Sequence, residues 1–156
     1  DLLVVRELTG GIYFGDKTRT ADSASDACVY TVAEVERIAR VAFEAAGERH
    51  GRRVTSVDKA NVLEPSRLWR ETVSRLAPEY EGIELDHLLV DNAAMQLVSR
   101  PSDFDVSVTE TVATPVPIDQ LRDVRDSLGG QIVPYDLASG EVVDRRAGRV
   151  CGVANG

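Results

Sequence analysis

The sequence has 156 residues, of which 43% are hydrophobic and 28% are charged, a size and composition typical of one soluble globular domain. Its 18 basic and 26 acidic residues give a net charge of −8, which disfavours nucleic-acid binding because polyanions are bound by clustered cations. We expect no membrane span, no secretory leader, a cytoplasmic location and two reduced thiols at Cys28 and Cys151.

The chain is expected to open with a buried strand and a glycine turn. Residues 2–5 are all apolar, which is typical of a strand covered on both faces. Thr9-Gly10-Gly11 predicts a flexible turn. We then expect a short extended piece over residues 12–14 and a polar loop over residues 16–26.

Residues 31–49 carry the clearest helix pattern. Thr31 with Glu34 three residues later is a capping-box sequence, in which each side chain satisfies a free backbone N–H. Apolar residues then recur at helical spacing and predict one buried face. They are Val35, Ile38, Ala39, Ala42, Phe43 and Ala46.

Strand and helix patterns alternate from residue 54 to residue 108. The predicted strands cover residues 54–57, 83–90 and 104–108. The predicted helices begin near Pro65 and at Asp91, and end before Pro78 and Pro101. The order βαβαβαβ predicts an α/β fold, in which helices cover a sheet.

The last third of the chain has a different pattern. Residues 115–128 predict an amphipathic helix. From residue 131 onward, glycines separate the short apolar pieces 132–133 and 142–143, which predicts a hairpin or irregular structure. We therefore expect a main domain over residues 1–110 and a divergent extension, with a helix and a hairpin, over residues 111–156.

Five polar residues lie at or just after predicted strand ends, where α/β sheets usually bind ligands. They are Arg6, Tyr13, Lys59, Asn61 and Asp91. Arg6 is suited to clamp a carboxylate, unless it only pairs with Glu7. Tyr13 is suited to act as a general acid, unless it is simply a packed aromatic residue.

Lys59 and Asp91 also have two interpretations each. Lys59 is suited to proton transfer, or it forms a surface ion pair with Asp58. Asp91 is suited to bind Mg²⁺ or Mn²⁺, or it only caps a helix. The sequence contains no nucleophile elbow, phosphate loop or dinucleotide fingerprint, and Glu110 has no evident partner for paired-carboxylate hydrolysis.

Four motifs in order give these residues a context: VRELTGGIYFG at 5–15, SVDKANVLEPSRLWRETV at 56–73, LVDNAAMQLV at 89–98 and FDVSVTE at 104–110. Together they closely resemble the second, dimer-forming domain of the 3-isopropylmalate dehydrogenases. Isocitrate dehydrogenases share the same arrangement of motifs, but the residues in their motifs differ more from these. The resemblance covers about residues 1–110 and implies that family's α/β fold.

The resemblance implies a reaction and a set of roles. These enzymes oxidise a 2-hydroxy acid with NAD and a divalent cation, Mg²⁺ or Mn²⁺, and then decarboxylate it, in leucine biosynthesis. By resemblance, Arg6 binds substrate carboxylates and Tyr13 protonates the enol that forms when CO₂ leaves. Asn61 lies near nicotinamide, and Val62 shapes the isopropyl pocket.

The resemblance also implies a homodimer with shared sites. Lys59 assists proton removal in the partner's site, and Asp91 is a metal ligand supplied across the dimer. The segment 10–30 forms an arm between the subunits.

Two departures from the family weigh against activity of the chain alone. The 156 residues include no nucleotide-binding domain, and Glu110 is not followed by the N-x-FGD-x-x-SD stretch that supplies two more metal-binding aspartates. We expect the isolated chain to be inactive. The alternative is a non-catalytic dimerisation or acid-binding module descended from such a domain.

Overall fold

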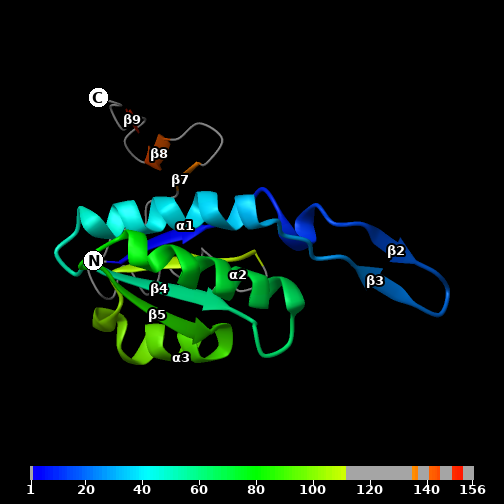
Figure 1. Cartoon of the computed structure of the whole chain (residues 1–156). Coiled ribbons are helices and arrows are strands. Elements are labelled where there is room, and N and C mark those ends of the chain that lie inside the picture. The colour runs from blue at the N-terminus through cyan, green and yellow to red at the C-terminus, as the bar shows by residue number, and fades with distance from the viewer. Residues whose placement is uncertain (1, 112–134, 137–140, 145–148, 153–156) are drawn as a thin grey trace.

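A four-stranded parallel sheet forms the centre of the computed structural model, which describes residues 2–111 and the strands 135–136, 141–144 and 149–152 (Figure 1). The strand order is β1-β6-β4-β5, and all three pairings are parallel. The strands are β1 (Leu3–Arg6), β4 (Arg53–Asp58), β5 (Glu84–Leu89) and β6 (Val106–Thr109). The predicted α/β class is confirmed.

Helices cover both faces of this sheet. Helices α1 (Val32–Gly47) and α2 (Glu64–Leu76) pack together on one face, and α3 (Val90–Ser99) lies on the other (Figure 1). The division follows from the strand order, because right-handed crossovers place a helix on opposite faces when the chain moves in opposite directions across a sheet. The chain steps outward from β1 to β4 and β5, and returns through α3 to β6.

The main core lies between the sheet and the α1–α2 pair. The predicted apolar face of α1 is fully buried there, together with Trp69 of α2. Trp69 donates a hydrogen bond from its indole N–H to the Ser56 hydroxyl at 3.1 Å, so this buried aromatic residue leaves no unpaired donor. The capping box is also confirmed: Thr31 Oγ1 accepts from Glu34 N at 3.3 Å, and Glu34 Oε2 accepts from Thr31 N at 2.7 Å.

Two predictions for the first thirty residues are wrong. Residues 12–14 are not extended, because Gly11–Tyr13 form a 3₁₀ helix, η1. Residues 16–26 are not a loop, because β2 (Lys17–Arg19) and β3 (Ala24–Asp26) form an antiparallel hairpin that projects from the body (Figure 1). All residues of both strands are exposed, so the hairpin has no apolar alternation by which a strand is recognised.

The C-terminal predictions are tested only in part. Three short antiparallel strands, β7 (Tyr135–Asp136), β8 (Glu141–Asp144) and β9 (Arg149–Gly152), include the hairpin expected around residues 142–143. The helix predicted over 115–128 lies outside the described residues.

In the described part, no helix is long and apolar enough to cross a membrane, and Cys28 is a free thiol.

Gly11 controls the turn between β1 and the hairpin. Its φ of +76° is a left-handed conformation that glycine adopts without steric cost. A Cβ atom at this position would lie 2.3 Å from the Tyr30 hydroxyl oxygen. The turn therefore requires glycine for two independent reasons.

Gly11→Ala is expected to lower the free energy of unfolding by at least about 1–2 kcal/mol, the cost of a left-handed L-residue. Gly47→Ala is the matched control, because a Cβ there meets only Ile83 Cδ1 at 3.7 Å at the end of α1. It should raise stability by about 0.5–1 kcal/mol. Urea denaturation of both variants measures the difference, and equal effects would contradict this account of the turn.

Candidate functional site

The predicted site residues gather at the carboxyl edge of the parallel sheet. Arg6 ends β1, Lys59 follows β4, and Asp91 lies just after β5 in the first turn of α3. Strand β6 lies between β1 and β4 and continues into Glu110 and Thr111. Because β1 and β4 are two strand spacings apart, their ends lie about 10 Å from each other.

Arg6 and Tyr13 form one pair at this edge. The Arg6 guanidinium carbon lies 5.9 Å from the centre of the Tyr13 ring, within the range of a cation–π contact. Arg6 Nη2 donates to Thr111 O at 3.4 Å, while its buried Nε has no acceptor among the described residues. The alternative interpretation of Tyr13 is wrong, because 61% of this residue is exposed.

Lys59 and Asp91 form a second pair. Their side chains make a direct ion pair, with the lysine 25% and the carboxylate 71% exposed. The alternative ion pair with Asp58 is not formed, because both carboxylate oxygens of Asp58 accept from Arg70, at 2.8 and 3.0 Å. Nor does Asp91 cap α3, whose N-cap is Leu89.

Asn61 and Val62 lie on a tight turn after Lys59. Backbone bonds from Val62 N and Leu63 N to Lys59 O, at 2.9 and 3.0 Å, close this turn. Both side chains are exposed, Val62 by 62%. The turn thus keeps both residues beside Lys59, on the side of the second pair.

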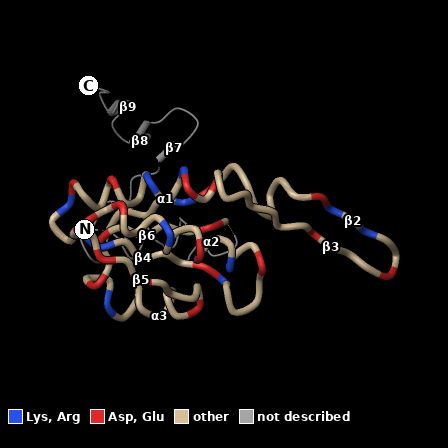
Figure 2. Tube along the Cα trace, viewed as in Figure 1, with Lys and Arg blue, Asp and Glu red and all other residues tan. Residues whose placement is uncertain are grey.

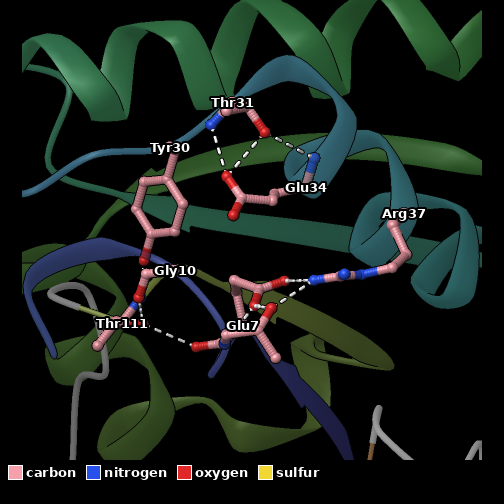
Figure 3. A network of polar contacts seen from close by, with 8 residues as sticks. Glu7, Gly10, Tyr30, Thr31, Glu34, Arg37 and Thr111 are labelled. Atoms are coloured by element: carbon pink, nitrogen blue, oxygen red, sulfur yellow. Dashed lines mark hydrogen bonds and ion pairs between the residues drawn. The ribbon is translucent and has the colours of Figure 1, made fainter. Parts of the chain in front are cut away.

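Glu7 is a buried residue that sequence reasoning missed. It has no exposed surface, and its Oε2 accepts from Arg37 Nη2 at 3.1 Å, while Oε1 accepts from Thr9 N and Oγ1 (Figure 3). The predicted alternative of an Arg6–Glu7 pair is therefore wrong. Arg37 lies thirty residues later, on α1, so no short-range sequence pattern predicts the contact.

Tyr30 and Thr111 complete this network (Figure 3). Thr111 N donates to the Tyr30 hydroxyl at 2.9 Å, and Thr111 Oγ1 donates to Glu7 O at 2.8 Å. Burial raises the pKa of Tyr30 to about 12, although its hydrogen bond with Thr111 opposes the shift. The network joins the ends of β1 and β6 to the base of the hairpin.

Glu110 is the second buried carboxyl that sequence reasoning left without a partner. Its Oε1 accepts from Lys59 N at 3.1 Å and from the Ser66 hydroxyl. Its Oε2 is buried with no partner among the described residues. Burial raises the pKa of Glu110, although the hydrogen bonds from Ser66 and Lys59 oppose the shift.

The described residues do not by themselves fit a divalent metal ion. They contain no group of three or more His, Cys, Asp or Glu side chains placed to hold one. Asp91 has the oxygen ligand that Mg²⁺ prefers, but one exposed carboxylate is far from an octahedral shell. A metal centre would need ligands from beyond this described part of the chain.

The fold and the edge residues define an α/β domain that presents a cation–aromatic pair and a lysine–carboxylate pair at the carboxyl ends of a parallel sheet. The sequence profile of the family described as isocitrate/isopropylmalate dehydrogenase matches residues 1–130. The chain belongs to this family. The match extends beyond residue 110, where the motifs recognised in the sequence end.

Curated proteins with similar sequences include 3-isopropylmalate dehydrogenases. A 3-isopropylmalate dehydrogenase of Clostridium acetobutylicum is 56% identical over 133 residues, which cover 83% of this chain and 37% of the relative. One from Wolinella succinogenes is 54% identical over 130 residues, covering 83% and 36%. The chain therefore spans little more than a third of the length of these relatives.

Solved structures agree with this assignment. An isocitrate dehydrogenase from Methylococcus capsulatus matches with a TM-score of 0.66 and 39% identity, over 70% of this chain and 34% of that chain. A β-decarboxylating dehydrogenase from Thermococcus kodakarensis, in its apo form, matches with a TM-score of 0.65 and 34% identity, over 78% and 35%.

The raised pKa of Tyr30 predicts a loss of stability in alkali. An unfolded tyrosine ionises near pH 10, whereas the folded-state pKa is about 12, so between these values the unfolded state binds fewer protons and the free energy of unfolding falls as the pH rises. In Tyr30→Phe, the part of this fall that comes from ionisation of Tyr30 should be absent. Urea denaturation from pH 9 to 12 compares the two proteins, and parallel pH profiles would contradict the prediction.

Proposed function

We propose that this chain forms the substrate-side domain of an NAD-dependent 3-isopropylmalate dehydrogenase, and that it works as a homodimer with two shared sites. One observation carries the proposal: four edge residues separate into two contacting pairs, Arg6 with Tyr13 and Lys59 with Asp91. In the proposed dimer, the first pair serves its own subunit's site and the second pair serves the partner's site.

The surface around the second pair supports a partner chain. Asp91, Met95 and Val98 follow one another at i, i+4 and i+7, so they share one face of α3. Met95 is 65% and Val98 71% exposed. Contiguous exposed apolar surface marks sites that another protein covers, and these two side chains lie on the same face of α3 as Asp91. A second copy would bury this face and bring Asp91 and Lys59 to the edge of its own site.

The pair Arg6–Tyr13 is suited to the substrate's acid groups and to the final proton transfer. The Arg6 guanidinium can bind a carboxylate of 3-isopropylmalate through two parallel N–H bonds. Tyr13 is exposed and in our proposal donates its phenolic proton to the enol carbon after CO₂ leaves. Its place on η1, beside Arg6, would keep this donor next to the bound acid.

The pair Lys59–Asp91 is suited to the first proton transfer. In our proposal, Lys59 assists removal of the proton from the substrate hydroxyl in the partner's site. Val62, on the turn after Lys59, would contact the isopropyl group, and Asn61 would contact the nicotinamide. Since this turn and the ion pair hold Lys59, Asn61 and Val62 together, they would enter the partner's site as a unit.

NAD and a divalent cation are part of the proposal, with Asp91 as this chain's contribution to the metal. The cation would polarise the substrate's oxygen, and NAD would accept the hydride. Among the described residues no group of three His, Cys, Asp or Glu side chains could hold the cation, so Asp91 would act together with ligands from elsewhere. We place the activity in the cytoplasm.

A non-catalytic dimerisation or acid-binding module is the second candidate. The incomplete metal ligand set in the described part of the chain favours it. This candidate keeps the dimer and the Arg6 carboxylate contact but predicts no NADH formation from any longer natural form of the chain.

Mixing two inactive variants tests the shared sites. In a form of the protein that also carries a nucleotide-binding domain, Tyr13→Phe and Lys59→Met should each lower kcat by 100-fold or more. After subunit exchange at equal amounts, half of the dimers are mixed and each has one intact site, so activity should return to about a quarter of the wild-type value. NADH absorbance with 3-isopropylmalate and Mn²⁺ measures it.

The control mixes Tyr13→Phe with Arg6→Ala, because both changes lie in the same pair and leave no intact site in a mixed dimer. No recovery in the first mixture, with dimers shown by light scattering, would rule out shared sites. Wild-type protein without turnover would rule out the dehydrogenase and favour the non-catalytic module.

The 156-residue chain by itself is expected to form no NADH from 3-isopropylmalate, NAD and Mn²⁺. The physical reason is that its described residues hold one of the metal's carboxylate ligands and no complete ligand set. Absorbance at 340 nm with purified chain checks this. Measurable turnover would contradict it and would show that the chain assembles a metal site on its own.

A further inference from the structure

Two consecutive residues at the end of the central strand contact both halves of the candidate site. Strand β6 pairs with β1 on one side and with β4 on the other. Beyond Thr109, Glu110 bonds toward the Lys59 side and Thr111 bonds toward the Arg6 side. Both halves are therefore tied to two adjacent residues at the end of one strand rather than to separate loops.

The contacts of Glu110 fix the backbone on which Lys59 stands. Glu110 Oε1 accepts from Lys59 N at 3.1 Å and from the hydroxyl of Ser66, in the first turn of α2. The carboxyl has no exposed surface, so water cannot replace these bonds and their loss would leave buried polar groups unpaired. One side chain thus holds the end of β4 and the start of α2 together.

The contacts of Thr111 fix the other half. Its carbonyl oxygen accepts from Arg6 Nη2 at 3.4 Å, and its hydroxyl donates to Glu7 O at 2.8 Å. Its N–H donates to the hydroxyl of Tyr30, the same hydroxyl that closes over Gly11 at the start of η1. Thr111 therefore helps to position Arg6 by a direct hydrogen bond, and Tyr13 indirectly, through Tyr30 and the Gly11 turn.

We propose that Glu110 and Thr111 are positioning residues, which set the spacing between the Arg6–Tyr13 pair and the Lys59–Asp91 pair. Neither residue needs to touch substrate in this role. The importance of the spacing rests on the proposed function, because a reacting group displaced by about 1 Å can lose on the order of 100-fold in rate. The contacts themselves can be tested without any turnover.

The first test follows backbone and side-chain signals by NMR in the 156-residue chain. Glu110→Ala removes the acceptor of Lys59 N–H, so exchange of that amide should become roughly five- to tenfold faster. Glu110→Gln keeps a side-chain carbonyl oxygen and should restore the wild-type rate. Thr111→Val keeps the backbone contacts to Arg6 and Tyr30 but removes the hydroxyl bond to Glu7 O, between Arg6 and the Gly11 turn. It should therefore shift the Arg6 Nε–H and Tyr13 ring signals while the Lys59 amide stays unchanged.

Thr72→Val is the matched control, because the Thr72 hydroxyl is buried on α2 with no partner in the described part of the structure. It should move none of these signals. The proposal is overturned if Thr111→Val resembles Thr72→Val, or if Glu110→Ala and Glu110→Gln give the same Lys59 exchange rate. Should Glu110→Ala fail to fold, the Thr111 and Thr72 comparison still decides.

The second test separates positioning from the function itself. In a longer form with a nucleotide-binding domain, Thr111→Val should lower kcat by about ten- to 100-fold with the KM for NAD unchanged, and Thr72→Val should leave both unchanged. An unchanged kcat in Thr111→Val overturns the positioning role. If no form turns over, the proposed function fails, while the NMR comparison still decides whether these residues hold the two pairs.

Discussion

The buried carboxylate of Glu7 is the constraint on which the rest of the site depends. A carboxylate with no exposed surface requires nearby donors, because leaving a buried polar group unpaired costs about 1–3 kcal/mol or more. Arg37 and Thr9 supply those donors. Since Arg37 lies on α1, the match fixes how this helix sits against the end of β1. Arg6 comes directly before Glu7 at the end of β1, and the glycine turn with Tyr13 follows directly after it, so their positions depend on this placement. Figure 3 shows Glu7 with Arg37 and Gly10.

Much of the fold could be predicted because most helices and strands carry a recognisable hydrophobic pattern. Apolar residues at helical spacing marked α1, and an apolar run marked β1. The β2–β3 hairpin escaped prediction because all of its strand residues are exposed. Its register rests on backbone pairing and on a 2.7 Å contact between the Thr18 and Ser25 hydroxyls. Hydrophobic patterning carries no signal for such a ribbon.

The strand-end positions of the candidate site residues were predictable, but their pairing was not. Strand ends correctly located Arg6, Lys59 and Asp91 at one edge. The nearest charges in sequence, Glu7 and Asp58, were the wrong partners, because each is buried and already matched by an arginine from a helix, Arg37 and Arg70. These arginines lie 12 and 30 residues away along the chain. At such separations the packing of the helices on the sheet determines which charged residues form ion pairs.

The projecting hairpin has a consequence for how the chain behaves in concentrated solution. A two-stranded ribbon leaves hydrogen-bonding groups open along both outer edges, and such edges can template strand pairing between molecules. Charged side chains interrupt this ribbon, with Lys17 and Arg19 on one strand and Asp26 on the other (Figure 2). Lys17 and Asp26 face each other across the two strands and form an ion pair at 3.7 Å, and the hydration of these charged groups works against non-specific strand pairing. The same edges stay open to a strand whose charges complement them. These few side chains therefore govern both which strand can pair with the hairpin and how well the chain stays in solution.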